Sequence, residues 1–431
     1  MVINGGKNMK NFYLTPELFL SLKKYSKKQF FNDVIAGIIV AIIALPLSIA
    51  LALASGVDPQ CGIYTAIAAG FIVSLLGGSK IQIAGPTAAF ATIVAGVVAA
   101  NGMDGLFIAT VIAGILLILM GVFKLGSFIK YMPHTITVGF TGGIAVTILL
   151  GQVKDFLGIT YINGEKPIET FEKVSANIEN ISTMSFWALL IGAISLLILI
   201  VYPKFEKKLP PSLIAVIVSA LIVNLIPEVN EGVYTIGELY NNIPAGLPQV
   251  NFAGIDFSKT LTVLPDAITI AILAAVESLL SCVVADGMVN AKHNPNMELV
   301  AQGFGNIGSV LFGGIPATGA IARTSANAKN GGRTPIAGMV HAIILLLVIL
   351  FLMPYAKLIP MPTIAAILFM VAYNMSEWKK FVEIFKLKDF SNILVLMVTF
   401  ILTVVFDLVV AIVAGIILHI VLLLIKKFTQ K

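Results

Sequence analysis

The sequence contains little charge and almost no cysteine. Only 12% of its 431 residues are charged, whereas 58% are hydrophobic, and the mean hydropathy is +0.98. A typical soluble domain has about 25% charged residues, so this composition excludes a soluble protein and indicates an integral membrane protein. The two cysteines, Cys61 and Cys282, lie in separate hydrophobic regions without a spaced motif, and therefore indicate neither a disulfide framework nor a metal cluster.

Histidines and targeting signals are equally scarce. The four histidines fall in separate segments, and no cluster of nucleophile, base and metal ligands can be assembled, so we expect neither a metal site nor an enzyme. The net charge of +6 comes from lysines at the chain ends and in short loops, which argues against nucleic-acid binding. The polar segment 1–33 lacks the apolar core of a cleavable signal peptide.

Long apolar runs are what the chain has in abundance. Runs near the ~20 residues that a helix needs to cross a bilayer recur between residues 34 and 425. They predict an all-α polytopic membrane protein. Twelve full-length candidates and two shorter ones give about 14 membrane segments. The full-length candidates are 34–54, 61–76, 106–123, 136–157, 186–202, 213–226, 264–286, 299–312, 338–353, 364–373, 393–406 and 408–425, and the shorter ones are 86–100 and 322–330.

The charges of the connections predict the orientation. If the N-terminus is cytoplasmic, alternate connections carry the lysines, with Lys357 as the exception, while the long outer connections 165–179 and 228–256 are acid-rich. An even number of segments returns the C-terminus to the same side. We therefore expect a multi-pass protein of the plasma (inner) membrane with both termini in the cytoplasm.

Two similar interruptions break the apolar pattern half a chain apart. The stretches LLGGSKIQIAGPTAAF (75–90) and LFGGIPATGAIARTSA (311–326) each run from a Gly-Gly helix end, through a Gly/Pro stretch that we expect to form a short strand, into a half-helix. Seven predicted segments precede the acidic loop near Glu231 and seven follow it, so the second repeat is inverted. Paired broken segments mark the midplane binding site of a transporter. The alternative is that these glycines only end helices.

The two predicted half-helices offer an anion site. A helix that begins inside the bilayer leaves its first N–H groups unpaired and points its positive dipole end at the ligand. Pro86 fits the first turn of one half-helix, and Arg323 adds a forked, always-charged donor to the other. Alternatively, Arg323 pairs structurally with a carboxylate or a loop carbonyl. The predicted binding residues are Thr87, Ala88, Ala89, Ala320, Ile321, Ala322 and Arg323, with Thr318 as a further hydroxyl donor.

Glu277 lies near the middle of the apolar span 264–286. An ionisable side chain at that depth costs about 3 kcal/mol or more and is a functional candidate by default. We expect Glu277, Ser281 one turn later, and Thr318 to hold the coupling ion, which is either a proton or Na⁺. No other metal or cofactor is expected. The alternative is a structural salt bridge between Glu277 and Arg323.

Several motifs occur in the order of a known family. From about residue 30 to residue 428 the chain resembles the SulP (sulfate permease, solute carrier family 26) inorganic anion transporters. This resemblance implies a seven-plus-seven inverted repeat, shared with nucleobase transporters, in which a core domain (segments 1–4 and 8–11) moves against a gate domain (segments 5–7 and 12–14). The motifs are FFNDVIAGIIVAIIALPLSIALALASGV, GIYTA, GGSKIQIAGPTAAF, YMPHTITVGFTGG, ESLLSCVVADG, ELVAQGFGNIGSVLFGG and PATGAIARTSANAKNGGRTPIAG.

The resemblance also implies roles for site residues. The substrate would lie between the third and tenth segments, walled by Leu47 and Leu51 of the first segment. Glu277 falls at the position of the family's acidic coupling residue, and Ser281 where bicarbonate-carrying relatives have a hydroxyl beside sodium. Those relatives have Asp at the first position and lack Arg323, which favours a proton-coupled oxyanion such as sulfate.

The family further implies a homodimer and a C-terminal cytoplasmic STAS domain, which has no counterpart before Lys431. We expect a secondary active anion transporter with elevator-type alternating access. The alternatives are an uncoupled anion channel, an anion exchanger or a nucleobase transporter. The expected division is a cytoplasmic segment (1–33), core segments 1–4 and the start of the gate (34–157), gate segments 6–7 with outer loops (158–260), core segments 8–11 (261–353), gate segments 12–14 (354–426) and a short cytoplasmic tail (427–431).

Overall fold

A computed structural model describes residues 14–23, 25–127, 133–162, 167, 169–206, 209–240, 256–387, 389–406 and 408–429. Residues 1–13 and 24 of the predicted N-terminal segment, part of the predicted acidic outer loop and the last two residues of the predicted tail lie outside these residues.

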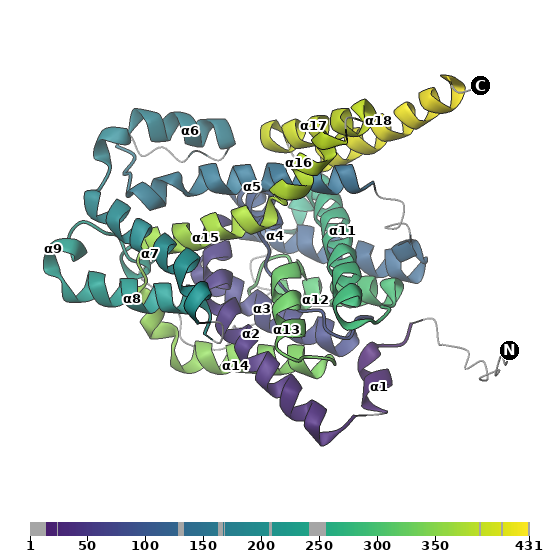
Figure 1. Cartoon of the computed structure of the whole chain (residues 1–431), viewed down its shortest axis with the longest axis horizontal. Helices are drawn as coiled ribbons and strands as arrows, with labels where there is room; N and C mark the ends of the chain where they lie inside the picture. The colour runs from purple at the N-terminus through teal and green to yellow at the C-terminus, as the bar shows by residue number, and fades with distance from the viewer. Residues whose placement is uncertain are drawn as a thin grey trace.

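The described residues are almost entirely helical, as the apolar runs predict (Figure 1). The helices of the first half are α1 (Glu17–Leu22), α2 (Lys27–Ala54), α3 (Pro59–Leu76), η1 (Ala88–Phe90), α4 (Ala91–Val122), α5 (His134–Leu157), α6 (Thr170–Glu179), η3 (Ile181–Thr183), α7 (Phe186–Phe205), α8 (Pro211–Leu225), α9 (Pro227–Asn230) and α10 (Ile236–Leu239). Those of the second half are η4 (Phe257–Thr260), α11 (Leu264–Val289), α12 (Pro295–Leu311), α13 (Ile321–Lys329), α14 (Ile336–Phe351), η5 (Met353–Leu358), α15 (Met361–Met375), α16 (Trp378–Lys386), α17 (Phe390–Val405) and α18 (Leu408–Thr429).

Six of the described helices are long and apolar enough to cross a membrane, and four more apolar helices are shorter. The total of about 14 segments therefore stays a prediction. The predicted segments 86–100 and 106–123 are two helical stretches of α4 that meet at a kink at Gly102, whose backbone (φ 71°, ψ −176°) is not helical. Glycine adopts such a positive φ without a steric penalty, so the chain bends between the two stretches.

The helix starts and ends follow local chemistry. α12 begins at Pro295, and the Asn294 side chain accepts hydrogen bonds from the N–H groups of Asn296 and Met297. This arrangement satisfies N–H groups that the helix itself leaves unpaired. α5 ends at Gly158, whose left-handed backbone (φ 64°) closes the last turn.

The helices form two groups, and the helices of each group pack against one another. In one group, α12 lies against α3 and α4, α14 lies against α2 and α3, and α11 lies against α4. In the other, α5 lies against α15 and α17, and α7 lies against α8 and α15. Close approach is possible because small residues line the contacts: a Cβ on Gly303 of α12 would collide with the carbonyl of Gly114 on α4. Gly303 lies in the glycine-containing stretch AQGFGN, and small residues of this kind allow helices in a membrane to pack closely.

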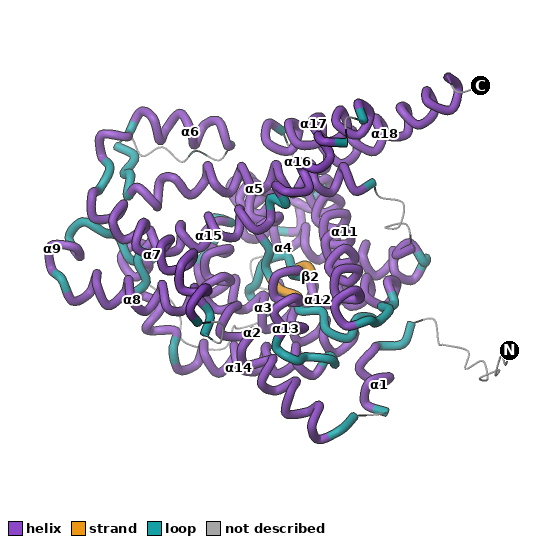
Figure 2. Tube along the Cα trace, in the orientation of Figure 1, coloured by secondary structure: helices purple, strands orange, loops and turns teal. Residues whose placement is uncertain are grey.

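Two short strands lie at the centre of the molecule (Figure 2). β1 (Ala84–Gly85) pairs with β2 (Thr318–Gly319) in antiparallel register, with Ala84 opposite Gly319 and Gly85 opposite Thr318. The two interruptions of the apolar pattern therefore meet, although 234 residues separate Ala84 from Thr318 in the sequence.

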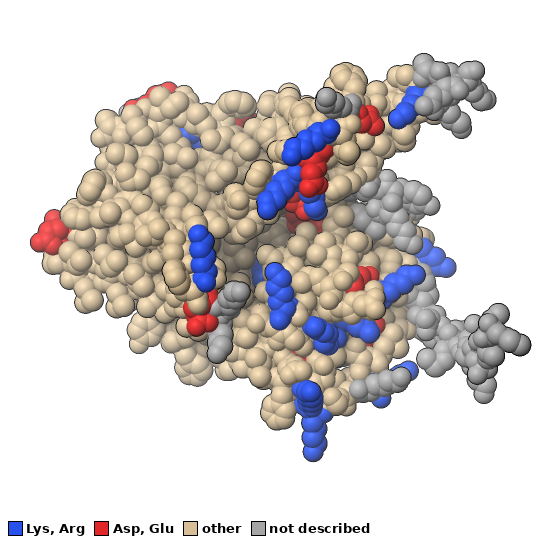
Figure 3. All heavy atoms as spheres, viewed as in Figure 1, with Lys and Arg blue, Asp and Glu red and all other residues tan. Residues whose placement is uncertain are grey.

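The outer surface is largely apolar. Leu197 on α7, Leu221 on α8 and Ile417 on α18 are each more than half exposed, as expected for side chains that face lipid. On the face drawn in Figure 3, the basic residues gather around α13 and α16, and the region of α7 and α8 is mostly uncharged. The surface is hollowed near the centre of this face, beside α13.

Candidate functional site

The strand pair brings the starts of two helices together. η1, which continues into α4, has Thr87 at its N-cap, and α13 has Ala320 at its N-cap. The Ala320 N–H donates to the Ile83 carbonyl at 2.8 Å. This hydrogen bond fixes the start of α13 against the segment that leads through β1 to η1. Neither N-cap side chain hydrogen-bonds to its helix, so the first N–H groups are left for a ligand.

The first helix begins two residues later than the sequence predicted, at Ala88 instead of Pro86. Thr87 has an extended backbone (φ −129°, ψ 158°), so it is the N-cap and Pro86 precedes the helix instead of opening its first turn. The extended conformation continues β1, and this pairing with β2 takes precedence over the preference of proline for a first helical turn. The first helical N–H groups are therefore those of Ala88 and Ala89, while Thr87 contributes its hydroxyl.

Glu277 of α11 joins the two helix starts. Its Oε2 atom accepts a hydrogen bond from the Thr87 hydroxyl at 2.9 Å and another from the Thr318 hydroxyl at 2.9 Å. The two hydroxyl oxygens are 3.5 Å apart. A single carboxylate oxygen thus bridges the first and second interruptions, and a change in its protonation state alters contacts to both.

Arg323 is almost fully buried, with 1% of its surface exposed. Its guanidinium lies against β1, where a Cβ on Gly85 would collide with Nη1, and its Nη2 atom donates to the Pro86 carbonyl. Its Nε and Nη1 atoms have no partner. Arg323 and Glu277 form no ion pair in the part of the chain that the structure describes. Of the structural partners expected for Arg323, a carboxylate or a loop carbonyl, the structure contains the carbonyl. This contact leaves part of the buried positive charge of Arg323 without a counter-ion.

Ser281 does not join the predicted coupling group. Its hydroxyl is 3.4 Å from that of Thr324 on α13, and it is fully buried there. Thr324 in turn accepts the Ile83 N–H at 3.0 Å. The one-turn spacing from Glu277 is present, but α13 packs against this part of α11 and turns the Ser281 hydroxyl away from the carboxylate. The side-chain oxygens of Glu277 and Thr318 are in contact, as predicted, whereas the Ser281 hydroxyl does not contact either of them.

The remaining predicted residues divide between a buried and an open side. Ala88, Ala89 and Ala320 are buried, whereas Ile321 is 44% exposed and Ala322 is also exposed. Since they lie in the first turn of α13, this end of the helix opens to the outside of the protein. Leu51 of α2 is buried in the main core, and Leu47 packs against a cluster that contains Ala366 and Ile367 of α15.

Sequence reasoning missed the side chains that hold β2 in place. The Ser278 hydroxyl accepts the Gly319 N–H at 3.0 Å. Asn306 of α12 clamps Ala317, donating to its carbonyl at 2.9 Å and accepting its N–H at 2.9 Å. The signal in the sequence is the stretch AQGFGN, which places Asn306 as a polar residue in an apolar helix. Among the described residues, no group of three His, Cys, Asp or Glu side chains is arranged to hold a metal ion.

Comparison with known proteins identifies the family. The model of the sulfate permease family matches residues 30–399. A putative sulfate transporter of Bacillus subtilis, YvdB, is 43% identical over 400 residues, which cover 93% of this chain and 74% of that protein.

Solved structures share the fold. The transmembrane domain of a cyanobacterial bicarbonate transporter, BicA, matches with a TM-score of 0.79 and 30% identity, over 90% of this chain and 98% of that one. The murine anion transporter Slc26a9 in its inward-facing state matches with a TM-score of 0.86 over 98% of this chain and 73% of that one; at 17% identity it supports the fold alone. These domains have the seven-plus-seven inverted-repeat fold, as predicted for this chain. The chain is a multi-pass membrane transporter of inorganic anions, not an enzyme, and it belongs to the sulfate permease family.

Proposed function

We propose that this protein is a secondary active transporter of an inorganic oxyanion, with sulfate favoured and bicarbonate as the alternative. The observation that carries the proposal is the Glu277 carboxylate, which hydrogen-bonds to Thr87 and Thr318 at the starts of both half-helices. An acidic group in contact with both sides of an anion site gives a direct means of coupling. Protonation of Glu277 removes a negative charge next to the anion and lowers the repulsion between them.

The donor set supports an oxyanion. The free N–H groups of two helix starts and the partly unpaired guanidinium of Arg323 are donors, and oxyanions offer several acceptors at once. The names of the relatives support the same class, since one is described as a putative sulfate transporter and another as a bicarbonate transporter. Arg323 occupies the region where a nucleobase transporter would need a second carboxylate, which disfavours that alternative.

A proton suits the coupling site better than sodium. A sodium site here would draw on oxygens of Glu277, Thr318 and Ser281, but the Ser281 hydroxyl faces Thr324. Glu277 and Thr318 with Thr87 form a compact group that needs no further ligand to exchange a proton. We therefore assign the coupling role to Glu277 protonation, with Thr318 as its hydrogen-bond partner.

The packing of the helices supports elevator-type movement. The group around α3, α4 and α12 contains both half-helices, and the group around α5, α7, α15 and α17 packs within itself. We assign the first group to the moving core (34–157 in part and 261–353) and the second to the gate (158–260 and 354–426). The proposal includes a homodimer in the plasma (inner) membrane with both termini in the cytoplasm.

An uptake panel tests this function. Purified protein in liposomes is given labelled sulfate, bicarbonate, chloride or a dicarboxylate, each with and without an inward gradient of H⁺ or Na⁺. Concentrative uptake of sulfate that requires the proton gradient supports the proposal. Uptake that depends on neither gradient identifies an uncoupled channel. Uptake that requires an anion inside the liposomes identifies an exchanger. Uptake that depends on the sodium gradient contradicts the assigned role of Glu277.

A further inference from the structure

A second buried carboxylate, Glu298, lies outside the anion site. It belongs to the first turn of α12 and is fully buried. In the described part of the chain it forms no ion pair with a lysine or arginine. A buried acidic side chain in a membrane protein is expensive and usually functional, and none of the contacts at the half-helix starts uses this one.

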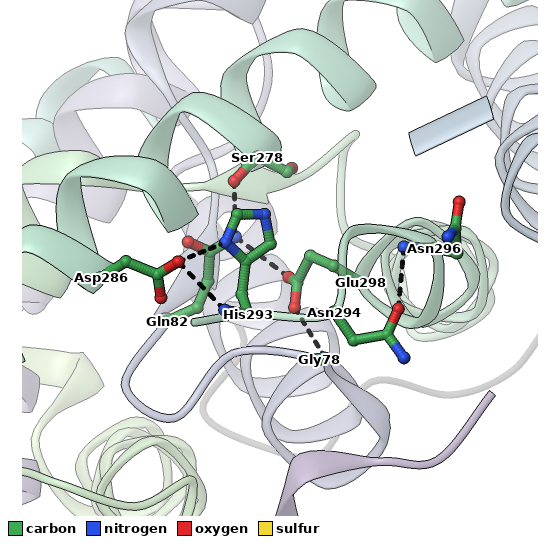
Figure 4. Close-up of polar contacts among 8 residues, drawn as sticks. All are labelled: Gly78, Gln82, Ser278, Asp286, His293, Asn294, Asn296 and Glu298. Carbon is green, nitrogen blue, oxygen red and sulfur yellow. Dashed lines mark hydrogen bonds and ion pairs between the residues drawn. The ribbon is translucent and has the colours of Figure 1, made fainter. Parts of the chain in front are cut away.

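Three N–H donors from different segments satisfy Glu298. Its Oε2 atom accepts the Gly78 N–H at 2.9 Å, directly after the end of α3 (Figure 4). Its Oε1 atom accepts Nε2 of Gln82 at 3.0 Å and Nε2 of Gln302 at 3.0 Å. Gly78 is held through both of its backbone polar groups, because its carbonyl also accepts the Asn294 N–H at 2.9 Å. Glu298 therefore anchors the segment that leads from α3 into β1.

Gln82 carries this contact on to the anion site. Its Nε2 atom also donates to the carbonyl of Ser278 at 3.1 Å, and Ser278 follows Glu277 in α11. The same side chain lies directly against β2, where a Cβ on Gly319 would collide with Nε2. The next residue, Ile83, provides the carbonyl that holds the N-cap of α13. A shift of the Gln82 side chain therefore moves α11, which carries Glu277, and the starts of η1 and α13 relative to one another.

We infer that Glu298 is a positioning residue for anion transport: through Gln82, it sets the relative position of the two half-helix starts and the Glu277 helix. This inference rests on the anion site proposed above. Neither side chain contacts the anion. Since a misplacement of about 1 Å lowers binding and turnover strongly, loss of the Glu298–Gln82 contact raises the KM for the anion.

The test compares Glu298→Gln and Gln82→Met with the control Gln302→Met. The control removes a donor to the same Oε1 atom but has no contact with the anion site in the described residues. Concentration-dependent uptake into liposomes gives KM and the maximal rate, and thermal unfolding in detergent reports stability. We expect both test variants to raise KM about tenfold. We expect the control to stay within about twofold, although its unfolding temperature falls as well.

The double variant tests whether Glu298 and Gln82 act through the same contact. Because both side chains act through one contact, Glu298→Gln with Gln82→Met should raise KM about tenfold, not about a hundredfold. A fully additive double variant, or an unchanged KM in both single variants, overturns the inference. If Glu298→Gln does not fold, the KM of Gln82→Met decides alone. Arg323→Ala is measured alongside: if it also leaves KM unchanged, the proposed anion site is wrong, whereas an effect of Arg323→Ala alone contradicts only the role of Glu298.

Discussion

At the scale of single residues, the proposed chemistry of the site depends on a partly buried carboxylate, Glu277, and a buried guanidinium, Arg323, that do not pair with each other among the described residues. Glu277 is held by two hydroxyls, and Arg323 is held by one backbone carbonyl. A direct salt bridge would neutralise both and remove the attraction for an anion. In the proposed mechanism, their separation leaves Arg323 available to a negative ligand and Glu277 available to a proton.

Substitution of Glu277 tests coupling. Glu277→Gln keeps the size of the side chain and an oxygen for Thr87 and Thr318, so we expect the protein to fold and to catalyse anion exchange. It should lose concentrative uptake driven by a proton gradient, because the amide does not titrate. Asp286→Asn is the control, since that carboxylate lies near the end of the same helix and pairs with His293. Unchanged accumulation by Glu277→Gln in liposomes would refute the coupling role.

Substitution of Arg323 tests the anion contact. Arg323→Ala removes the buried positive charge, and we expect anion affinity measured by calorimetry to fall at least tenfold, which corresponds to about 1.4 kcal/mol. Arg333→Ala is a matched control, because that guanidinium donates to the carbonyls of Ala328 and Gly332. Equal affinity in Arg323→Ala and the unmodified protein would leave Arg323 only its structural contact with Pro86.

Substitution of Thr87 tests the location of the substrate. Thr87→Trp places a large ring between the half-helix starts and should abolish uptake without preventing folding, since Thr87 is only partly buried. Thr87→Ser keeps the hydroxyl that donates to Glu277 and should transport nearly normally. Normal flux through Thr87→Trp means that the substrate binds elsewhere.

At the scale of secondary-structure elements, the half-helices depend on close backbone approach. β1 and β2 pair through only two residues each, and the site is held by the side chains around them, including Ser278 and Asn306. The helices behind them approach through glycines, as at Gly303 against Gly114. In a bilayer this kind of packing replaces the hydrophobic effect as the source of helix association.

A bulky side chain at this contact should destabilise the protein. Gly303→Val forces α12 away from α4, and we expect it to lower stability by about 1–3 kcal/mol, as overpacking of a close contact does. Gly287→Ala in α11 is the control, because no atom lies within 4 Å of its added Cβ. Thermal unfolding in detergent measures both. An unfolding temperature of Gly303→Val equal to that of the control would show that the α4–α12 contact is not limiting.

At the scale of the whole molecule, the proposed elevator mechanism requires the two helix groups to move past each other. α2 carries Leu47 of the anion-site wall and packs against α15 of the other group. Leu47 belongs to the same apolar cluster as Ala366 and Ile367. Among the described residues no hydrogen bond joins α2 to α15, so the helices can slide along this apolar contact without breaking one.

A cross-link between the groups should stop transport. In the double variant Leu47→Cys with Met370→Cys, which replaces two partly buried side chains of the same apolar cluster, a short bifunctional thiol reagent should abolish turnover while anion binding persists. A reagent that is cleaved by reduction should restore turnover. The single-cysteine variants serve as controls, and the native Cys61 and Cys282 are buried from the reagent. Full transport by the cross-linked protein would contradict movement between α2 and α15.

The sequence by itself determined the class of the molecule and predicted where a site would form. Long apolar runs leave backbone groups no partner but their own helix, so an all-α membrane fold follows from composition. Two matching Gly/Pro interruptions, Glu277 and Arg323 singled out the centre of the protein, because polar groups at membrane depth are rare. The structure brings Glu277 to Thr87 and Thr318, three residues that sequence reasoning had named.

Only the tertiary structure decided how these groups point and what supports them. Helical spacing placed Ser281 on the face of Glu277, yet contact with α13 turns its hydroxyl to Thr324. The N-cap at Thr87 was set by strand pairing between distant segments, and the anchoring by Glu298 and Gln82 joins residues 216 positions apart. Local propensity contains no information about such partners, because hydrogen-bond direction is fixed by packing among segments that meet only in the folded protein.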